Sequence, residues 1–197
     1  METYAFNALV ARMKYIARWG LMRSSRTESL SEHTADTAVL AHTLALLSVQ
    51  KFGTGVRPET VAVAALYHDA SEILTGDMPT PVKYKNETLR SAYKALEKDA
   101  AASLCALLPA ELQPPMEGYL RGDVLTEKEA QLLKAADRLS ALIKCVDEAQ
   151  SGNREFEGAL AQQTRALREM RCPEAEYFME HMLPCYRWTL DELSRQG

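Results

Sequence analysis

Apolar residues recur at steps of three and four along nearly the whole of this 197-residue chain. The segment from Tyr4 to Ile16 shows this spacing clearly, as the buried face of a helix requires. We find no alternation of apolar and polar residues of the kind that predicts a half-buried strand, and no internal repeat. The pattern predicts an all-α fold, and the length favours a single domain, residues 1–197, with a sizeable core.

Capping residues and prolines predict where the helices begin and end. Ser31 is a good N-cap for the second helix, which we expect to end near Phe52. Pro58 suits the first turn of the third helix. Thr126 and Glu129 have the spacing of a capping box. Further helices are expected at residues 86–108, 126–150, 153–171 and 173–196.

One irregular stretch, residues 74–81, interrupts the helical pattern. Gly76 can close the preceding helix in a left-handed turn. Proline restricts the residue before it to extended conformations. We therefore expect a stiff, extended loop in which Met78 precedes Pro79 and Thr80 precedes Pro81.

The charge balance argues against a protein that binds nucleic-acid polymers. The chain has 23 Lys and Arg against 27 Asp and Glu, a net charge of −4. Proteins that bind the phosphate backbone usually show the opposite balance. A small phosphorylated ligand remains compatible with this composition, because one or two well-placed basic residues suffice to hold it.

The sequence also favours a cytoplasmic protein that contacts no membrane. No apolar run approaches the ~20 residues that a membrane-spanning helix needs. The segment Met1–Arg18 has no apolar core of the secretory kind. The four cysteines show no C-x-x-C spacing, so we expect reduced thiols and neither a disulfide framework nor a zinc knuckle.

Two histidines and two aspartates form a candidate metal site: His33, His68, Asp69 and Asp137. The doublet His68-Asp69 is a weak signal alone, and the other two residues strengthen it. A mixed nitrogen and oxygen set suits a borderline divalent ion such as Mn, Co, Ni, Zn or Fe. Four protein ligands leave positions for water and for a substrate oxygen. His42 lies nine residues beyond His33, on the opposite helix face, so we expect one ion.

Asp137 allows two interpretations from the sequence alone. It lies on a mainly apolar helix face, where a carboxylate needs a cation or several hydrogen-bond donors. Lys134 and Lys144 are near enough on the same helix to form a structural salt bridge. The residues themselves leave a salt bridge and a metal ligand equally open.

Other candidate residues surround this set in the sequence. Glu72 follows His68 by four residues and would share its face if the helix continued, which suits a general acid or base. Arg18 and Trp19, expected to close the first helix, offer a forked phosphate donor and a flat apolar wall. Each also has an ordinary structural explanation, as a solvated glutamate or as a cap and a core anchor. The loop residues Asp77 and Thr80 could bind a sugar hydroxyl or a phosphate.

The set His33, His68-Asp69 and Asp137 resembles the HD-domain superfamily of metal-dependent phosphohydrolases. Longer blocks resemble the bacterial 5'-deoxynucleotidases: Arg18-Trp19 with residues 21–23, Ser31-Glu32-His33, Tyr67–Glu72, and residues 74–77 with 79–84. The likeness covers most of the chain, and the block from Tyr67 to Tyr84 is the most specific part. The resemblance implies a single HD-domain helical bundle over residues 1–197.

The resemblance implies hydrolysis of deoxyribonucleoside 5'-monophosphates to deoxynucleoside and phosphate. One divalent ion would be held by the residues that match the family's ligands, namely His33, His68, Asp69 and Asp137. Cobalt or manganese typically supports activity in such enzymes. Relatives are usually homodimers, so we expect a homodimer here.

The resemblance also assigns the substrate contacts. Arg18 would orient the phosphate, Trp19 would contact the substrate, and Glu72 would assist proton transfer. The loop residues Asp77, Met78, Pro79 and Thr80 would line the nucleotide pocket. Three of the metal ligands would also contact the substrate, namely His33, Asp69 and Asp137. Met78 stands where we expect leucine. A wall of Trp19 and the Asp77 loop close to C2' would favour deoxyribose.

Two other functions remain open at this level. Another HD phosphohydrolase could act on a triphosphate or on a cyclic or modified nucleotide, since Arg23 and Lys83 could serve as further basic groups. A non-catalytic nucleotide-binding helical domain is the other alternative. Loss of a ligand or of Glu72 would favour it, and neither is lost.

Overall fold

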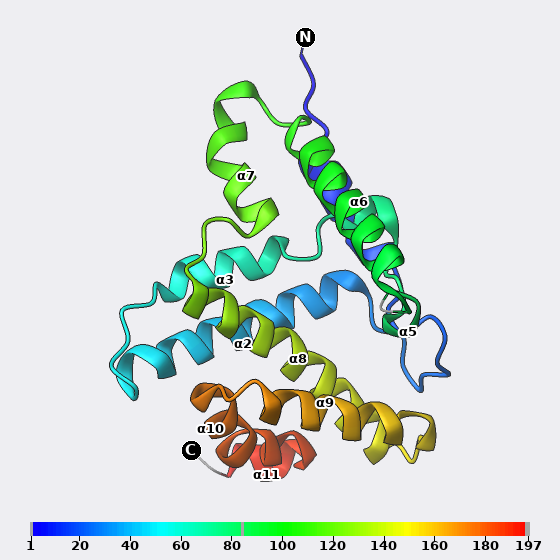
Figure 1. The fold of residues 1–197 in the computed structure, drawn as a ribbon. Helices are drawn as coiled ribbons and strands as arrows, with labels where there is room; N and C mark the ends of the chain where they lie inside the picture. The colour runs from blue at the N-terminus through cyan, green and yellow to red at the C-terminus, as the bar shows by residue number, and fades with distance from the viewer. Residues whose placement is uncertain (1, 84, 196–197) are drawn as a thin grey trace.

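The centre of the fold is a set of three helices, α2 (Leu30–Gln50), α3 (Pro58–Tyr67) and α8 (Glu127–Gln150) (Figure 1). The structure is a computed structural model, and it describes residues 2–83 and 85–195, without the side chain of Thr80. Helix α2 packs against both α3 and α8. Their shared apolar face contains fully buried residues such as Leu44, Leu132 and Leu139.

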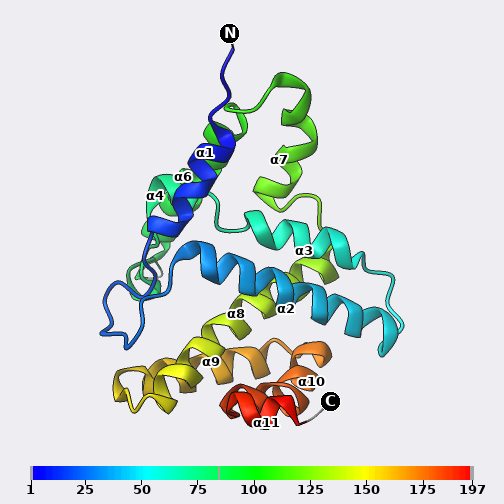
Figure 2. The same cartoon turned by 180° about the vertical axis from the view of Figure 1, so that it is seen from behind.

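The last helices cover the other side of α2 and α8. They are α9 (Glu157–Glu169), α10 (Pro173–His181) and α11 (Leu190–Ser194), with the 3₁₀ segments η3 (Arg154–Phe156) and η4 (Leu183–Arg187). Leu167 and Phe178 join the same apolar core as α2 and α8. Figure 2 shows these helices at the end of the molecule opposite to α1.

A second, smaller apolar cluster holds the other end together. It joins α1 (Phe6–Val10), α6 (Glu87–Cys105) and α7 (Gln113–Arg121) through buried residues that include Phe6, Leu104 and Leu120. The remaining short elements are α4 (Glu72–Thr75), α5 (Thr80–Lys83), and the 3₁₀ segments η1 (Ala11–Tyr15) and η2 (Ala110–Leu112).

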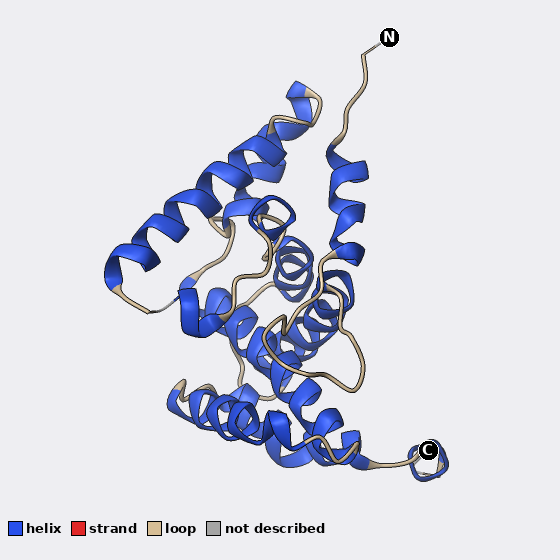
Figure 3. Ribbon diagram, turned by 90° about the vertical axis from the view of Figure 1, so that its right-hand side faces the viewer, coloured by secondary structure: helices blue, strands red, loops and turns tan. Residues whose placement is uncertain are grey.

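The all-α prediction is confirmed for the part of the chain that the structure describes. Figure 3 shows helices and loops and no strand, and the only pairing of strand type there is an isolated bridge between Ala17 and Ser29. No helix among residues 2–83 and 85–195 is long and apolar enough to cross a membrane. All four cysteines are free thiols.

Several helix boundaries differ from the sequence-based expectation. Ser29, and not Ser31, caps α2, because its side chain and that of Glu32 exchange hydrogen bonds in a capping box. The first helix ends at Tyr15, so Arg18 and Trp19 lie beyond it and do not close it. The predicted place of Pro58 in the first turn of α3 is confirmed, and so is the capping box of Thr126 and Glu129 at the start of α8.

Two short helices were not predicted. Thr80 is helical and not extended, because it opens α5, in which Val82 and Lys83 both donate backbone hydrogen bonds to the carbonyl of Pro79. Pro81 is tolerated at this place, since the first turn of a helix needs no intrahelical amide donor. Helix α7 has the proline pair Pro114-Pro115 in its first turn, directly after Gln113, and Gly122 ends it in a left-handed conformation with φ of 76°.

Candidate metal centre

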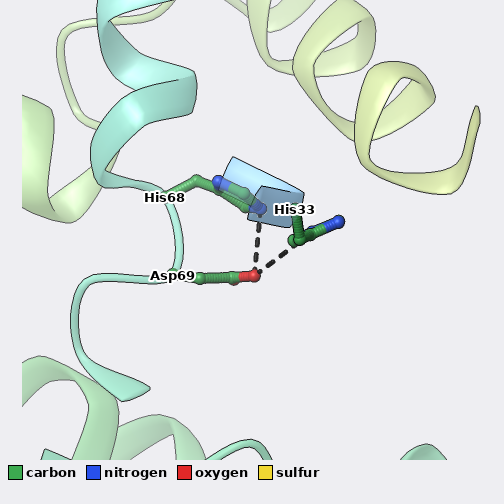
Figure 4. Close-up of side chains that lie close together, drawn as sticks. All are labelled: His33, His68 and Asp69. Carbon is green, nitrogen blue, oxygen red and sulfur yellow. Dashed lines mark ion pairs between the residues drawn. The ribbon is translucent and has the colours of Figure 1, made fainter. Parts of the chain in front are cut away.

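His33, His68 and Asp69 come together where α2 begins and α3 ends. One ligand atom from each residue lies within 4.8 Å of the others. Asp69 Oδ2 lies 3.1 Å from His68 Nε2 and 3.5 Å from His33 Nε2. Figure 4 shows both imidazoles directed toward this carboxylate oxygen. The fold therefore joins residues that are 35 positions apart in the sequence into one compact set of donors.

Each imidazole is oriented through its other nitrogen. His68 Nδ1 donates to the carbonyl of Ala65 at 2.7 Å, since a carbonyl only accepts. His33 Nδ1 lies 3.0 Å from the hydroxyl of Ser140 on α8. The two Nε2 atoms are buried and make no hydrogen bond to any described residue. Metal-binding histidines show this arrangement, in which the second nitrogen is fixed and the first carries a free lone pair.

Asp137 approaches the same cluster from the middle of α8. Its Oδ1 lies 3.2 Å from His33 Nε2. Lys144, a candidate salt-bridge partner, instead contacts Glu148 at 2.5 Å and the carbonyl of Arg26 at 2.6 Å. Within the described residues, the ion pair of Asp137 is with a histidine and not with either lysine. The structural salt bridge that the sequence left open is therefore not formed.

The charges of the cluster fit a divalent cation. Despite burial, the neighbouring histidines hold the pKa of Asp69 well below its usual value. Burial also raises the pKa of Asp137, but contact with His33 outweighs burial, so this pKa is lowered overall. Two carboxylates beside two neutral imidazoles give a net charge of −2, which a divalent ion balances. Burial lowers the pKa of His68, but Asp69 outweighs it and raises the pKa to about 9, so a proton partly balances this charge without a cation.

Glu72 is placed by a turn and not by a continuous helix. Helix α3 ends at Tyr67, and Glu72 begins α4, with its amide donating to the carbonyl of Asp69 at 3.0 Å. The side chain is buried, and Oε2 has no hydrogen-bond partner among the described residues. Burial, followed by the nearby charges of Asp69 and Asp77, raises the pKa of Glu72 to about 9. The carboxyl group therefore holds a proton at neutral pH in the absence of a cation.

Arg18 and Trp19 reach the site from the segment after η1. Arg18 Nη1 lies 3.5 Å from Asp69 Oδ2, and the arginine side chain is 12% exposed. Trp19 has a φ of 62°, in the left-handed region that non-glycine residues seldom adopt. Its ring packs on Phe156 with centroids 5.2 Å apart. Both side chains also donate hydrogen bonds to Glu28, a residue that no sequence motif marks as functional.

The loop after α4 lies beside Arg18. Gly76 does end α4 with a positive φ of 75°, which favours glycine, but its ψ of 160° shows an extended conformation and not the left-handed helical turn that the sequence predicted. Burial raises the pKa of Asp77, while the nearby Arg18 opposes that shift. Tyr93 on α6 donates to the carbonyl of Gly76 at 3.2 Å and so fixes the start of this loop, a role that the sequence analysis missed.

The other loop residues are only partly described. Met78 and Pro79 are half-buried. The side chain of Thr80, a predicted substrate contact, lies outside the described part of the chain. His42 is half-buried and does not join the candidate metal cluster, as its place on the opposite helix face predicted, and His181 is exposed.

A separate surface depression lies on α9, away from this chemistry. It has a volume of about 650 Å³ and is lined by residues such as Leu160, Thr164 and Arg168. It shares no residue with the histidine and aspartate cluster. We place the candidate site at the cluster, because the oriented imidazoles and the buried carboxyl group of Glu72 are there.

Comparison with known sequences gives consistent matches over the full chain. The model of the family described as 5'-deoxynucleotidase YfbR-like matches residues 5–186. A 5'-deoxynucleotidase of Cronobacter sakazakii is 45% identical over 197 residues, covering 100% of this chain and 99% of the relative. The 5'-deoxynucleotidase YfbR of Escherichia coli is 43% identical over the same length, with coverage of 100% and 99%.

Solved structures share the fold. An HD-domain phosphohydrolase from Listeria innocua superposes with a TM-score of 0.80 at 24% identity, over 97% of this chain and 95% of its own. The cyanophage S-2L HD phosphohydrolase, solved with dA and one catalytic Zn²⁺ ion, gives a TM-score of 0.63 at 18% identity, over 90% and 95% of the two chains. At these identities, the likeness establishes the helical architecture.

Proposed function

The chain belongs to the YfbR-like 5'-deoxynucleotidase family, and from that premise we propose which of its residues hold the metal, bind the substrate and move the proton. Its activity is the hydrolysis of deoxyribonucleoside 5'-monophosphates to the deoxynucleoside and inorganic phosphate. Water adds to phosphorus, the bond from phosphorus to O5' breaks, and a proton reaches O5'. Metal binding, phosphate binding and proton transfer are each assigned to different side chains of the site.

The proposed metal ligands are His33, His68, Asp69 and Asp137. The observation that carries this assignment is the pair of buried Nε2 atoms without a hydrogen-bond partner among the described residues, each set by a partner on the opposite ring nitrogen. Both atoms face the carboxylates of Asp69 and Asp137, at 3.1 to 3.5 Å, and a cation bound between these nitrogen and oxygen atoms explains that convergence better than a structural role does. When bound, a divalent cation supplies Lewis acidity, which lowers the pKa of water and offsets charge on phosphate oxygens.

Arg18 is proposed to bind the phosphate. Its guanidinium is held beside Asp69, at the edge of the cluster, by a contact of 3.5 Å. A planar fork of N–H donors matches phosphate oxygens and fixes their orientation. Because phosphoryl transfer depends mainly on positioning and charge, no serine or cysteine nucleophile is required. A phosphate group bound to Arg18 would therefore lie next to the proposed metal ligands His33 and His68.

Glu72 is proposed to move the proton. Its Oε2 is buried without a described partner, and the carboxyl group keeps a proton under conditions where an exposed glutamate would not. A protonated carboxyl group can donate to the departing O5' and recover a proton from water. A pKa of about 9 keeps the carboxyl group protonated at neutral pH, so Glu72 is ready to donate, and the carboxylate that remains readily takes a proton back.

Trp19 and the loop of Asp77, Met78, Pro79 and Thr80 are proposed to form the nucleoside side of the pocket. The half-buried Asp77 and the Trp19 ring flank Arg18, so a nucleotide with its phosphate on Arg18 extends between them. A flat indole close to C2' leaves little room for a hydroxyl group. We expect this wall to favour deoxyribose, with His33, Asp69 and Asp137 contacting the substrate from the cluster.

The finer properties follow the family resemblance. We propose that cobalt or manganese supports activity, because a mixed set of imidazoles and carboxylates accepts such borderline ions. We also propose that residues 1–197 form one HD domain and that the chain acts as a cytoplasmic homodimer. Size-exclusion chromatography with light scattering tests the last of these directly.

A substrate and metal panel tests the proposed function. Purified protein is stripped of metal and given Co²⁺, Mn²⁺, Mg²⁺ or Zn²⁺, with each ribo- and deoxyribonucleoside 5'-monophosphate in turn. The expected result is release of inorganic phosphate from the deoxy series, with Co²⁺ or Mn²⁺ most effective. Release of pyrophosphate or tripolyphosphate from triphosphates, with none from monophosphates, would contradict the proposal.

A further inference from the structure

A single carboxylate oxygen accepts hydrogen bonds from both Arg18 and Trp19, the two proposed substrate-binding residues that precede α2. Glu28 Oε2 accepts a hydrogen bond from Arg18 Nε at 3.2 Å and another from the indole Nε1 of Trp19 at 2.8 Å. We infer that Glu28 is a positioning residue that fixes Arg18 and Trp19 relative to each other. In doing so it couples phosphate binding to the discrimination between deoxyribose and ribose. The inference rests on the proposed function, because that assigns the two residues to the substrate.

Trp19 needs such a restraint because its backbone is in an unfavourable conformation. Its φ of 62° belongs to the left-handed region, where a bulky side chain is an outlier. The ring is held on one side by Phe156, and the indole N–H is held by Glu28. The Trp19 carbonyl accepts from the amide of Met22 at 2.8 Å and so closes a tight turn. Without Glu28, the tilted contact with Phe156, at an interplanar angle of 58°, would hold the ring without a hydrogen bond to its N–H.

Arg18 depends on Glu28 in a different way. Its guanidinium lies between two carboxylates, with Nε at Glu28 and Nη1 at Asp69. Nη2 makes no hydrogen bond or ion pair with the residues that the structure describes. These two contacts fix the plane of the fork and leave its outer edge available for phosphate oxygens. If Glu28 were absent, Asp69 would be the one remaining anchor, and the fork would turn toward the metal cluster.

Glu28 can act in this way because its own backbone is fixed. Arg18 donates its amide to the carbonyl of Glu28 at 2.9 Å, and the next residues form the bridge between Ala17 and Ser29. Ser29 is also the N-cap of α2, the helix that carries His33. The carboxylate of Glu28 is 12% exposed, so water competes little for the two donors. The bridge between Ala17 and Ser29 therefore connects the segment of Arg18 and Trp19 to the helix that carries the metal ligand His33.

The loop between the two paired segments is anchored at its far end as well. The fully buried carboxylate of Glu148 on α8 accepts from the amide of Ser25 at 2.8 Å. Asn153 Nδ2 donates to the carbonyl of Arg23 at 2.8 Å. These bonds hold the loop against α8, so the backbone is anchored both before Glu28 and at the bridge that follows it.

The test compares Glu28→Ala and Glu28→Gln with Glu129→Gln, which alters another buried carboxylate that holds an arginine, Arg57. For Glu28→Ala we expect KM for dAMP to rise roughly tenfold and the ratio of kcat/KM between dAMP and AMP to fall roughly tenfold, as loss of a charged hydrogen bond implies. The kcat should change less than KM, and bound metal should stay the same. Glu28→Gln keeps an acceptor for the indole, so it should retain most of the discrimination while KM rises. Glu129→Gln should lower Tm alone.

A second readout does not depend on activity. In a Trp188→Phe background, Trp19 is the remaining tryptophan, and Glu28→Ala should shift its emission to the red and increase quenching by acrylamide. Unchanged discrimination and unchanged emission in Glu28→Ala would overturn the inference, as would an equal loss of discrimination in Glu28→Gln. A wild-type protein that releases no phosphate from any deoxynucleotide would contradict the proposed function instead. The fluorescence result would still decide whether Glu28 fixes Trp19.

Discussion

Asp69 Oδ2 lies 3.5 Å from Arg18 Nη1, and the same oxygen contacts both imidazoles of the candidate metal cluster. One carboxylate therefore joins the proposed phosphate-binding residue to the proposed metal site. This relationship explains how a small site can orient phosphate and offset its charge together. Glu72 is in none of these contacts, so loss of a metal ligand and loss of the proton-transfer residue should have separable effects.

Removal of metal ligands should abolish activity through loss of the ion. We expect His68→Ala and Asp137→Ala to bind little divalent metal after reconstitution with Co²⁺ or Mn²⁺, and to show no measurable phosphate release. Each variant deletes one donor of a set whose members support each other. Metal content is measured by elemental analysis of the purified variants. A variant with a full equivalent of metal and normal kcat would show that its residue is not a ligand.

Glu72→Ala should keep the metal and lose rate. Because Glu72 lies beside the cluster without being one of its proposed ligands, metal content should equal that of the wild type. The kcat should fall by roughly 10²–10⁴, the range for a general acid or base. Glu97→Ala is a suitable control, since it removes a more exposed glutamate that pairs with Lys83. An unchanged kcat in Glu72→Ala would remove Glu72 from proton transfer.

Trp19→Ala should relax the preference for deoxyribose. Loss of the indole opens space near C2', so the ratio of kcat/KM between dAMP and AMP should fall by roughly tenfold, the size expected for a steric contact in a pocket. Initial rates of phosphate release from both nucleotides measure this ratio. If the ratio stays the same, another part of the pocket excludes the 2'-hydroxyl group.

Acid should destabilise the fold through two buried carboxylates. Hydrogen bonds from Arg57 lower the pKa of Glu129 to about 2. Burial acts in the opposite direction on Glu148, but Lys144 and its other donors outweigh it and lower that pKa to about 2. Both folded-state values lie below the unfolded value of 4.5. The stabilisation is therefore complete above pH 4.5 and is lost as pH falls toward 2, by up to about 1.4 kcal/mol per pH unit for each group.

Urea unfolding between pH 3 and pH 7 measures this dependence. Glu129→Gln and Glu148→Gln should be less stable than the wild type at pH 7. The difference in the free energy of unfolding should shrink as pH falls below about 4, because the carboxylates then take up protons in the unfolded wild-type chain while they stay ionised in the folded one. A difference that stays constant over the whole pH range would mean that these carboxylates are not ionised in the folded protein.

Much of the helical layout could be predicted from local signals. Pro58 and the Thr126–Glu129 capping box act within a few residues of their own helix, so the sequence shows them directly. The start of α2 was placed two residues late, although Ser29 and Glu32 have the spacing of a capping box. Two serines close together can both serve as N-caps, and the reciprocal bond to Glu32 decides between them.

The candidate site shows where local signals end. The spacing from His68 to Glu72 suggested one helix face, whereas the chain turns after Tyr67 and places Glu72 by that turn. The left-handed φ of Trp19 and the double contact of Glu28 depend on packing against Phe156 and on pairing with distant backbone. No residue pattern near positions 19 or 28 indicates them. Such features follow from tertiary contacts and require the structure.

All the proposed roles depend on one divalent cation that binds between α2, α3 and α8. The most direct measurement is anomalous diffraction at the cobalt edge from a crystal grown with excess Co²⁺. We expect one strong peak within coordination distance of His33 Nε2, His68 Nε2 and the carboxylates of Asp69 and Asp137. A map with no peak there, and with the four side chains turned away from one another, would contradict it.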